Sequence, residues 1–370
     1  MANTFKQISA GYSRSLALLQ GNSAWAWGNV GRSADSASAA TPWAAICGSS
    51  PEEIGHNRFA QPLPQLLNPD SPYLYLTDAI NGLMALDIHG QVDMVASSTS
   101  LITGAAHAPI TGIASGMKQI CANETASYAL DSSGKVWSWG GNFQGQLGRQ
   151  SDAVLNQPPV KIETLPKITH LATGKNHTLA LSDRGEVWAW GANAAGQLGQ
   201  GNLKPLTTPA RVLINTAILA IAAGDTHSLA IDANGRLYAW GSHNKGQLGP
   251  IMSSQLIGFS ASPLRVKLGF KLKQVDAGMH YTIALSDQGE LYAWGWNGMG
   301  QLGESAVNAT NRATKISDLK RVREISAGAF HALALNDRGL YAWGDNRNSA
   351  CGISIAQAEV VKKPNLISFA

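Results

Sequence analysis

The sequence has 370 residues, of which 44% are apolar and 14% are charged, and its net charge is +4. This composition supplies a large core and excludes an intrinsically disordered chain. The small net charge gives no reason to expect nucleic-acid binding.

The cysteine spacing and the N-terminal sequence indicate which cellular compartment to expect. Cys47, Cys121 and Cys351 lie far apart and form no CxxC pair, which argues against a disulfide framework or a zinc site. The N-terminus lacks a signal-peptide pattern, and no apolar run reaches the roughly 18 residues that cross a bilayer. We therefore expect a cytoplasmic monomer without membrane contact; secretion as an effector by another signal stays open.

Three short segments recur along the chain seven times, with a decayed second copy. The first resembles AGxxHxLAL and occurs at residues 8–18, 76–86, 120–130, 171–181, 221–231, 275–285 and 325–335. The second is an aromatic-x-Trp-Gly segment, usually followed by GQLG, at residues 24–28, 136–148, 187–199, 237–249, 291–303 and 340–352, and in the decayed copy Val95 and Ala96 replace Trp-Gly. The third usually begins with proline, at residues 64–67, 109–112, 159–162, 209–212, 263–266, 313–316 and 364–367.

Alternating side chains in these segments predict β-strands. Trp188 and Trp190 are two residues apart, so both point to one face of a strand while Ala189 points to the other. We expect such tryptophans to form core and assign them no ligand role. Asp183 and Gly185 lie between two strands, where they are typical of a hairpin turn rather than of an acidic site.

The spacing of the segments predicts how strands share sheets. Pro159 to Gly174 and Pro209 to Gly224 are both 15 positions apart, whereas the spacing before each proline varies. The constant spacing predicts that the proline strand opens each sheet and that the variable spacing connects sheets. Residues 1–370 then form one all-β domain, a seven-bladed β-propeller of four-stranded antiparallel blades.

The two chain ends suggest how the ring closes. The sequence starts at an AGxxH segment without a proline segment before it, and it ends on a proline segment. We expect the C-terminal strand to join the N-terminal blade, because this covers two open sheet edges. A strand kept in the last blade is the alternative.

The combined pattern AGxxHxLALxxxGxVYxWGxNxxGQLG resembles the regulator-of-chromosome-condensation repeat family over nearly the whole chain. Matching residues include Gly174, His177, Leu179, Gly185, Trp190, Gly191, Asn193, Gly196, Gln197, Leu198 and Gly199. The resemblance implies a seven-bladed propeller, and its members serve in nucleotide exchange on GTPases, ultraviolet sensing, enzyme inhibition and partner binding. The resemblance therefore predicts the fold of this chain better than its function. The ultraviolet receptors carry Trp in the GxxHT turn, and the absence of Trp from these turns disfavours that role.

We expect structural roles for most residues of the types that catalyse reactions or bind ligands. The run 298–303 spells GxGxxG, but it repeats a structural loop and no helical pattern follows, so we expect no cofactor. His177, His227 and His331 share one repeat position in different blades, so we expect buried, hydrogen-bonded side chains rather than a metal site. Without GxSxG, HExxH or a P-loop, we expect no catalytic residues and no enzyme activity.

One end of the predicted blades carries both the GxxH turns and the loops after Trp-Gly. The repeated residues of these loops are the same from blade to blade, whereas the residues between them vary. Aromatic, Met and Arg side chains are typical of interface hot spots. The predicted partner-binding residues in these loops are Phe143, Gln144, Lys245, Trp296, Met299 and Arg347. Packing onto the neighbouring blade is the alternative for these side chains.

Two other stretches stand out. The long connection 29–61, next to the decayed repeat, adds Trp43 and His56 as predicted partner-binding residues, because long loops on rigid scaffolds are often functional; a drifted insertion is the alternative. The basic runs 265–273 and 320–323 are either solvated flanks of strands or a patch for an acidic partner.

The sequence thus predicts a non-catalytic propeller that binds a protein partner through its loop-bearing face. One alternative is a guanine-nucleotide exchange factor for a Ran-like small GTPase, acting through residues 29–61. Another is an inhibitor that caps an enzyme.

Overall fold

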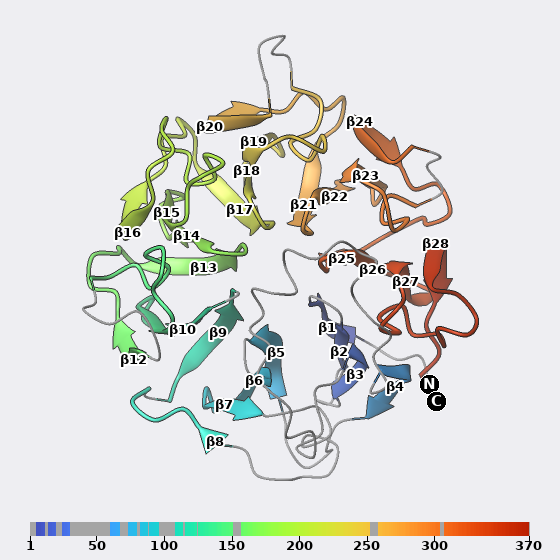
Figure 1. Cartoon of the computed structure of the whole chain (residues 1–370), viewed down its shortest axis with the longest axis horizontal. Helices are drawn as coiled ribbons and strands as arrows, with labels where there is room; N and C mark the ends of the chain where they lie inside the picture. Colours follow the sequence, from blue (N-terminus) through green and yellow to red (C-terminus); the bar gives the residue numbers. More distant parts are fainter. Residues whose placement is uncertain are drawn as a thin grey trace.

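The computed structural model describes residues 5–11, 14–19, 24–29, 60–66, 73–79, 82–87, 89–95, 108–113, 115–123, 125–150, 157–251, 258–303 and 307–369. In these ranges the chain forms 28 strands and no helix. The strands make seven four-stranded antiparallel sheets, which stand as blades around a central axis (Figure 1). The predicted all-β, seven-bladed propeller is confirmed.

The strands of each blade follow one another from the axis outward, and we number the blades 1 to 7 in chain order. Blades 1 to 3 contain β1 (Phe5–Ala10), β2 (Arg14–Leu19), β3 (Ala24–Asn29), β4 (Ala60–Leu66); β5 (Tyr73–Ala79), β6 (Gly82–Asp87), β7 (Val92–Val95), β8 (Ala108–Pro109); and β9 (Met117–Ala122), β10 (Ala126–Asp131), β11 (Val136–Gly140), β12 (Gln157–Lys161). Blades 4 and 5 contain β13 (Ile168–Thr173), β14 (His177–Ser182), β15 (Val187–Gly191), β16 (Leu206–Arg211); and β17 (Ile218–Ala223), β18 (His227–Asp232), β19 (Leu237–Ser242), β20 (Phe259–Arg265). Blades 6 and 7 contain β21 (Leu272–Ala277), β22 (Tyr281–Ser286), β23 (Leu291–Trp296), β24 (Ala309–Lys315); and β25 (Glu324–Ala327), β26 (His331–Asn336), β27 (Gly339–Asp345), β28 (Val360–Leu366).

The proline strand closes each blade rather than opening it, so that prediction was wrong. β16 pairs with β15 of the same sheet, with Trp188 opposite Arg211. The constant 15-position spacing therefore spans the connection between blades, and the variable spacing lies inside a blade. Neighbouring blades repeat one packing geometry, which fixes the length of the connector, whereas the outer loop faces solvent and tolerates insertions.

The ring closes by side-chain contacts and a backbone hydrogen bond from Ala329 N to Gly11 O, not by a shared sheet, so the prediction that the C-terminal strand joins the N-terminal blade was also wrong. β28 pairs with β27 in blade 7, because four-strand blades that begin at an inner strand are complete by themselves. Across the closure, Ile8 N donates to Glu324 Oε1 at 3.3 Å. Beyond β28, the Phe369 ring packs 5.4 Å from Trp25 and 5.9 Å from Trp27 of blade 1.

The decayed second repeat still builds a blade. Its sheet has four strands, but the outermost, β8, is only two residues long. Met84 and Leu86 remain fully buried and pack with residues of blade 3. Apolar alternation thus preserves the blade after the Trp-Gly signature has been lost.

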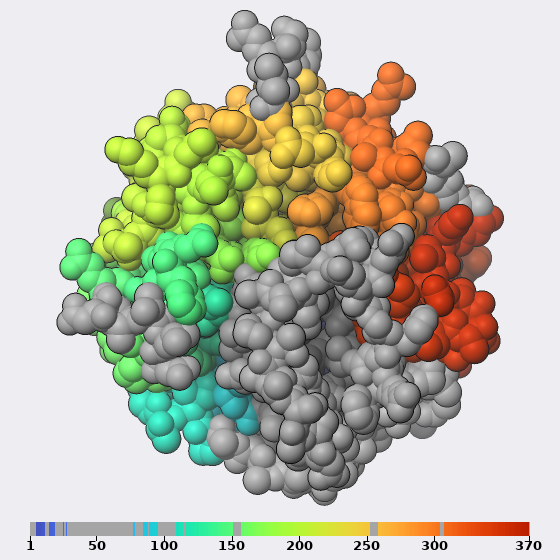
Figure 2. All heavy atoms as spheres, in the orientation of Figure 1, coloured from blue at the N-terminus to red at the C-terminus, as the bar shows by residue number. Residues whose placement is uncertain are grey.

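Side chains bridge the inner strands of successive blades. Gln119 Nε2 donates to Leu171 O at 2.8 Å, and Leu171 N donates back to Gln119 Oε1 at 3.0 Å. Gln274 makes the same pair of bonds with Ile325. These amides satisfy strand edges that would otherwise be open. In the space-filling view, blades 3 to 7 abut one another around the ring (Figure 2).

The tryptophan directly before the glycine of each aromatic-x-Trp-Gly segment in blades 4 to 7 lies between two blades. Trp190, Trp240, Trp294 and Trp343 are fully buried, and the small residue before each one is also buried. Trp240 Nε1 donates to Gln197 O in the preceding blade at 2.8 Å. The same bond recurs at Trp190, Trp294 and Trp343. The indoles are therefore scaffold, as predicted.

Candidate functional site

The strand order puts two rings of loops at one end of the blades. The turns 174–177, 224–227, 278–281 and 328–331 join the first and second strands, and the loops 140–148, 191–199, 241–249, 295–303 and 344–352 follow the third strands. We call this end the loop face. The opposite end, which carries the hairpins between second and third strands and the connectors between blades, is the hairpin face.

The loops after Trp-Gly in blades 3, 4 and 6 are each held by their own asparagine and glutamine, whereas blade 5 has His243 in place of the asparagine and blade 7 has Ala350 in place of the glutamine. Leu198 N donates to Asn193 Oδ1 at 2.9 Å, and Ala195 N donates to Gln197 Oε1 at 2.9 Å. Gly196 has a φ of +78°, which an L side chain rarely adopts. The equivalent bonds recur in the loop of blade 6. The repeated residues fix the loop backbone, and the residues between them are free to differ.

The repeated histidines are buried and hydrogen-bonded, as predicted, and their partners lie in the next blade, which the sequence did not predict. His177 Nε2 lies 2.9 Å from Ser228 Oγ in the next blade, and Ser228 Oγ donates to Gln197 O at 2.8 Å. His227 lies 3.1 Å from Thr282 Oγ1. His331 lies 2.9 Å from Ser15 Oγ across the ring closure. Burial lowers the pKa of both His177 and His227 to about 3, so both rings are neutral at pH 7.

The interface between blades 6 and 7 uses a different pair. Tyr281 stands where other blades have histidine, and its hydroxyl donates to His331 O at 2.5 Å and lies 3.0 Å from Gly328 O. The next blade has Ala332 where others have Ser228 or Thr282. The phenol ring reaches across the interface by itself, so a hydroxyl from the neighbour is not needed there.

Three predicted partner-binding residues are exposed on the loop face. Phe143 has a fractional exposure of 56%, and Gln144 and Lys245 are also exposed. Their backbones are held by glutamine side chains, since Gln144 N donates to Gln146 Oε1 at 2.6 Å and Lys245 N donates to Gln247 Oε1 at 2.9 Å.

The other three described residues are partly engaged within the ring. Trp296 is half-buried, and its ring lies 5.5 Å from Phe330 of blade 7 in an edge arrangement. Met299 is half-buried. Arg347 Nη2 lies 2.8 Å from Asp345 Oδ2, with side-chain exposures of 12% and 11%, so this arginine is a neutralised part of its loop. Trp43 and His56 lie outside the described residues.

The turns contribute residues that the sequence reasoning missed. Phe330 and His280 lie between the glycine and the repeated position of their GxxH-type turns, and both are half-buried. Burial lowers the pKa of His280, and the nearby Lys245 and Lys175 lower it further. Variation inside the GxxH turns is the sequence signal that points to these two residues.

The glycine run 298–303 forms another loop of the repeated kind, after β23, and no helix follows it. Gly298 packs directly against the Trp296 ring. Among the described residues, no three His, Cys, Asp or Glu side chains gather in a way that could hold a metal ion. The described chain also contains no helix long and apolar enough to cross a membrane.

Comparisons with known proteins give the same repeat. Residues 86–370 match the RCC1-like domain, and residues 5–31 match the Regulator of chromosome condensation (RCC1) repeat. The chain is 29% identical over 245 residues to the Ultraviolet-B receptor UVR8 of Arabidopsis thaliana, covering 64% of this chain and 55% of the relative. It is 33% identical over 254 residues to Protein RCC2 of Homo sapiens, covering 60% of this chain and 48% of the relative. The chain thus spans about half the length of these relatives.

Solved structures resemble the chain in fold. Prp20p of Saccharomyces cerevisiae aligns with a TM-score of 0.70 at 20% identity, covering 88% of this chain and 80% of that one. At that identity the likeness concerns the arrangement of blades alone.

Proposed function

Because the chain belongs to the RCC1-like domain family, we propose that it is a non-catalytic propeller whose loop face binds a protein partner. The observation that carries the proposal is the contrast within each loop after Trp-Gly. Asparagine and glutamine side chains fix the backbone in the same way in blades 3, 4 and 6, while the residues between them change. A rigid frame with variable side chains lowers the entropy cost of binding and leaves specificity to a few contacts.

The side chains on this face are suited to a protein partner. Phe143 exposes an aromatic ring, and Trp296 presents a second one that is braced by Phe330. Large aromatic side chains on a rigid support are frequent energetic centres of protein interfaces. Lys175 and Lys245, which both act on the pKa of His280, place positive charge on the same face. We infer a partner with an apolar contact surface bordered by acidic groups.

The test compares captured partners across single variants. Phe143→Ala and Trp296→Ala should each reduce the recovery of the same specific partner by tenfold or more. Leu213→Ala is the matched control, because Leu213 is 80% exposed but lies on a connector of the hairpin face. Undiminished recovery with both loop-face variants would refute the proposal.

Nucleotide exchange on a small GTPase is the second candidate. It is favoured by the likeness to Prp20p, the structure of which is described together with binding properties to Gsp1p and histones. Of the residues proposed to act on the GTPase, 29–61, the stretch 30–59 lies outside the described ranges. The candidate predicts that the protein accelerates release of a fluorescent guanine nucleotide from a Ran-type GTPase, and that deletion of 30–59 removes the effect. Unchanged release rates across a panel of small GTPases would exclude it.

A further inference from the structure

A basic groove lies on the hairpin face of blade 5, opposite the loop face. It has a volume of about 540 Å³ and is formed by the hairpin 234–237 and the connector 265–271. Four cations line it, namely Arg236, Arg265, Lys267 and Lys271, and no acidic residue does. All four side chains are exposed.

The neighbouring blades show what normally occupies this position. In blade 4, Glu186 lies 3.2 Å from Arg211, and in blade 6, Glu290 lies 2.5 Å from Lys315. Both pairs join the residue before the third strand to a cation on the fourth. Blade 5 keeps the cation as Arg265, opposite Tyr238, but has Arg236 in place of the glutamate. A recurring ion pair has thus become two like charges, which is unfavourable unless an anion joins them.

The hairpin of blade 5 also lacks the acid at its tip. Asp183 and Asp287 are exposed at the tips of the neighbouring hairpins, and blade 5 has Ala233 there. Asp232 is the nearest acid in the hairpin, but it is only 1% exposed. Its Oδ1 accepts the backbone N–H of Asn234 and of Arg236, both at 2.9 Å. This carboxylate holds the turn rather than shielding the guanidinium groups.

Blade 3 shows that two cations alone do not make this groove. It has Lys135 and Lys161 at the corresponding positions, but Lys161 Nζ lies 5.0 Å above the Trp137 ring, and its connector carries Glu163. The groove of blade 4, with the intact ion pair, measures about 230 Å³, and its connector contributes no charged residue. The larger volume and the two connector lysines are features of blade 5.

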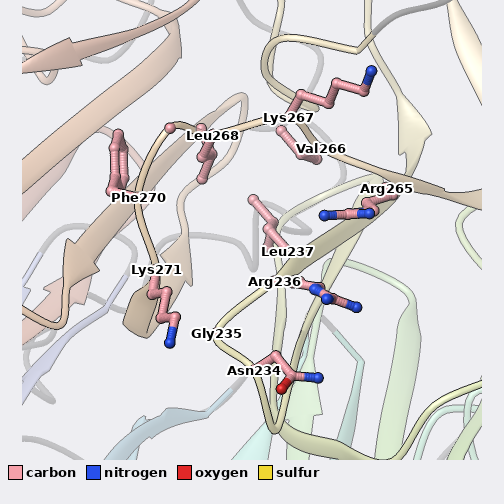
Figure 3. A pocket seen from close by; sticks show the side chains of 11 residues that line it. Asn234, Gly235, Arg236, Leu237, Arg265, Val266, Lys267, Leu268, Phe270 and Lys271 are labelled. Carbon is pink, nitrogen blue, oxygen red and sulfur yellow. The ribbon is translucent and has the colours of Figure 1, made fainter.

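We propose that this groove binds an acidic peptide segment of a protein partner, as a second site distinct from the loop face. In Figure 3 the Arg265 side chain extends to the left and the Arg236 side chain to the right, so that both guanidinium groups lie in the same part of the view, whereas the Lys267 side chain extends upward and the Lys271 side chain downward. Guanidinium groups match carboxylates with two parallel hydrogen bonds, and the diverging lysines fit acids spaced along an extended chain. Leu268 and Phe270, whose ring stacks 4.0 Å from Tyr292, add apolar contact along the connector.

Nucleic acid fits the groove less well. The cationic surface is bordered by Asp183 and Asp287, which are exposed at the hairpin tips of blades 4 and 6, while Glu186 and Glu290 are paired with Arg211 and Lys315. A phosphate backbone extending beyond blade 5 would meet these carboxylates on both sides, and a charged duplex gains affinity by contacting many cations in succession. A short acidic segment ends before it reaches them.

The test is fluorescence anisotropy with a labelled ten-residue peptide of alternating glutamate and serine, at low and at physiological salt. We expect saturable binding that weakens as salt rises. Arg236→Glu should weaken it at least tenfold, because it restores the ion pair of blades 4 and 6, where the fold already accepts glutamate. Lys267→Glu, on the exposed connector, should weaken it as well and serves if Arg236→Glu does not fold.

Arg338→Glu is the matched control, because it makes the same change of net charge at an exposed residue of the blade 7 hairpin. It should leave the affinity within twofold of the wild type. Three results would overturn the proposal: no peptide binding at low salt, equal losses in Arg236→Glu and Arg338→Glu, or a labelled duplex DNA that binds more tightly than the peptide and loses affinity with Arg236→Glu.

Discussion

At the scale of residues, histidine side chains of a type that often takes part in catalysis instead hold neighbouring blades together. A neutral imidazole at His177 or His227 is held by a hydroxyl of the next blade, and that hydroxyl donates to a loop carbonyl. The burial that makes this geometry possible also removes the imidazole from proton chemistry near neutral pH. The same residue type that suggests catalysis in a cleft therefore serves assembly here.

The buried histidines make stability depend on pH. In the unfolded chain His177 and His227 take up protons below about pH 6.5, but in the fold their pKa is about 3. The unfolded state therefore binds more protons between these values, and stability is lost as pH falls through that window. At pH 5 each histidine should cost about 2 kcal/mol relative to pH 7.5.

One buried acid acts in the opposite direction. Burial raises the pKa of Asp276 to about 6, so the folded state binds more protons than the unfolded state between about pH 4 and pH 6. The contribution of Asp276 to the stability of the fold is therefore lost as pH rises through this range. Urea unfolding of wild type and His177→Gln at pH 7.5 and 5.0 separates the two effects. The variant should lose about 2 kcal/mol less on acidification than the wild type; an equal loss would place the acid sensitivity elsewhere.

At the scale of elements, each blade is joined to the next by a small set of matched groups. The tryptophan of one blade donates to the loop carbonyl of the previous one, and a histidine–hydroxyl pair or a single tyrosine completes the contact. Where the preceding blade lacks the GQLG loop, as before blade 3, Trp139 is only half-buried. The loop and the indole are thus two parts of one interface.

Trp240→Ala should therefore destabilise the protein by about 3–5 kcal/mol, since it empties a buried site between blades. Trp240→Phe should cost less, because it keeps most of the packing and loses the hydrogen bond to Gln197 O. Trp139→Phe provides the comparison at a half-buried position. Thermal unfolding should rank Trp240→Ala as most damaging and Trp139→Phe as mildest; a reversed order would contradict the interface model.

The two interface types can be exchanged by design. Tyr281→His alone should destabilise the contact between blades 6 and 7, because Ala332 supplies no hydroxyl for the imidazole. Adding Ala332→Ser should recover part of the loss, with a coupling energy of about 0.5–3 kcal/mol. A double-mutant cycle measured by denaturant unfolding checks this, and strictly additive effects would show that the two positions do not communicate.

At the scale of the whole molecule, the ring is closed without exchanging a strand. Blade 7 and blade 1 share hydrogen bonds of the kind found at other interfaces, and Phe369 adds an aromatic contact with Phe5 and Trp25. Phe369→Ala should lower stability by about 1–3 kcal/mol. Hydrogen exchange should show the loss of protection first in blades 1 and 7; a change confined to blade 4 would argue against this closure.

The sequence was sufficient for the propeller, its seven blades and the role of the Trp-Gly segments, because each repeat carries its own alternation and turn residues. It was not sufficient for assigning the proline strand to a blade, because a constant spacing fits a rigid connector as well as a hairpin. The pairing of Arg347 with Asp345 and the bracing of Trp296 by Phe330 depend on side-chain positions that spacing does not determine. The significance of Arg236 depends on the ion pairs at the same position in the neighbouring blades, which the sequence alone does not show.

The most direct measurement is site-specific photo-crosslinking in lysate of the source cells, with a photoreactive amino acid placed at position 143 or, in a second protein, at position 213. Both positions are exposed, but they lie on opposite faces of the ring. We expect a discrete crosslinked partner from position 143 that is absent when Trp296→Ala is combined with it, and no such adduct from position 213. A partner captured from position 213 and none from position 143 would contradict it.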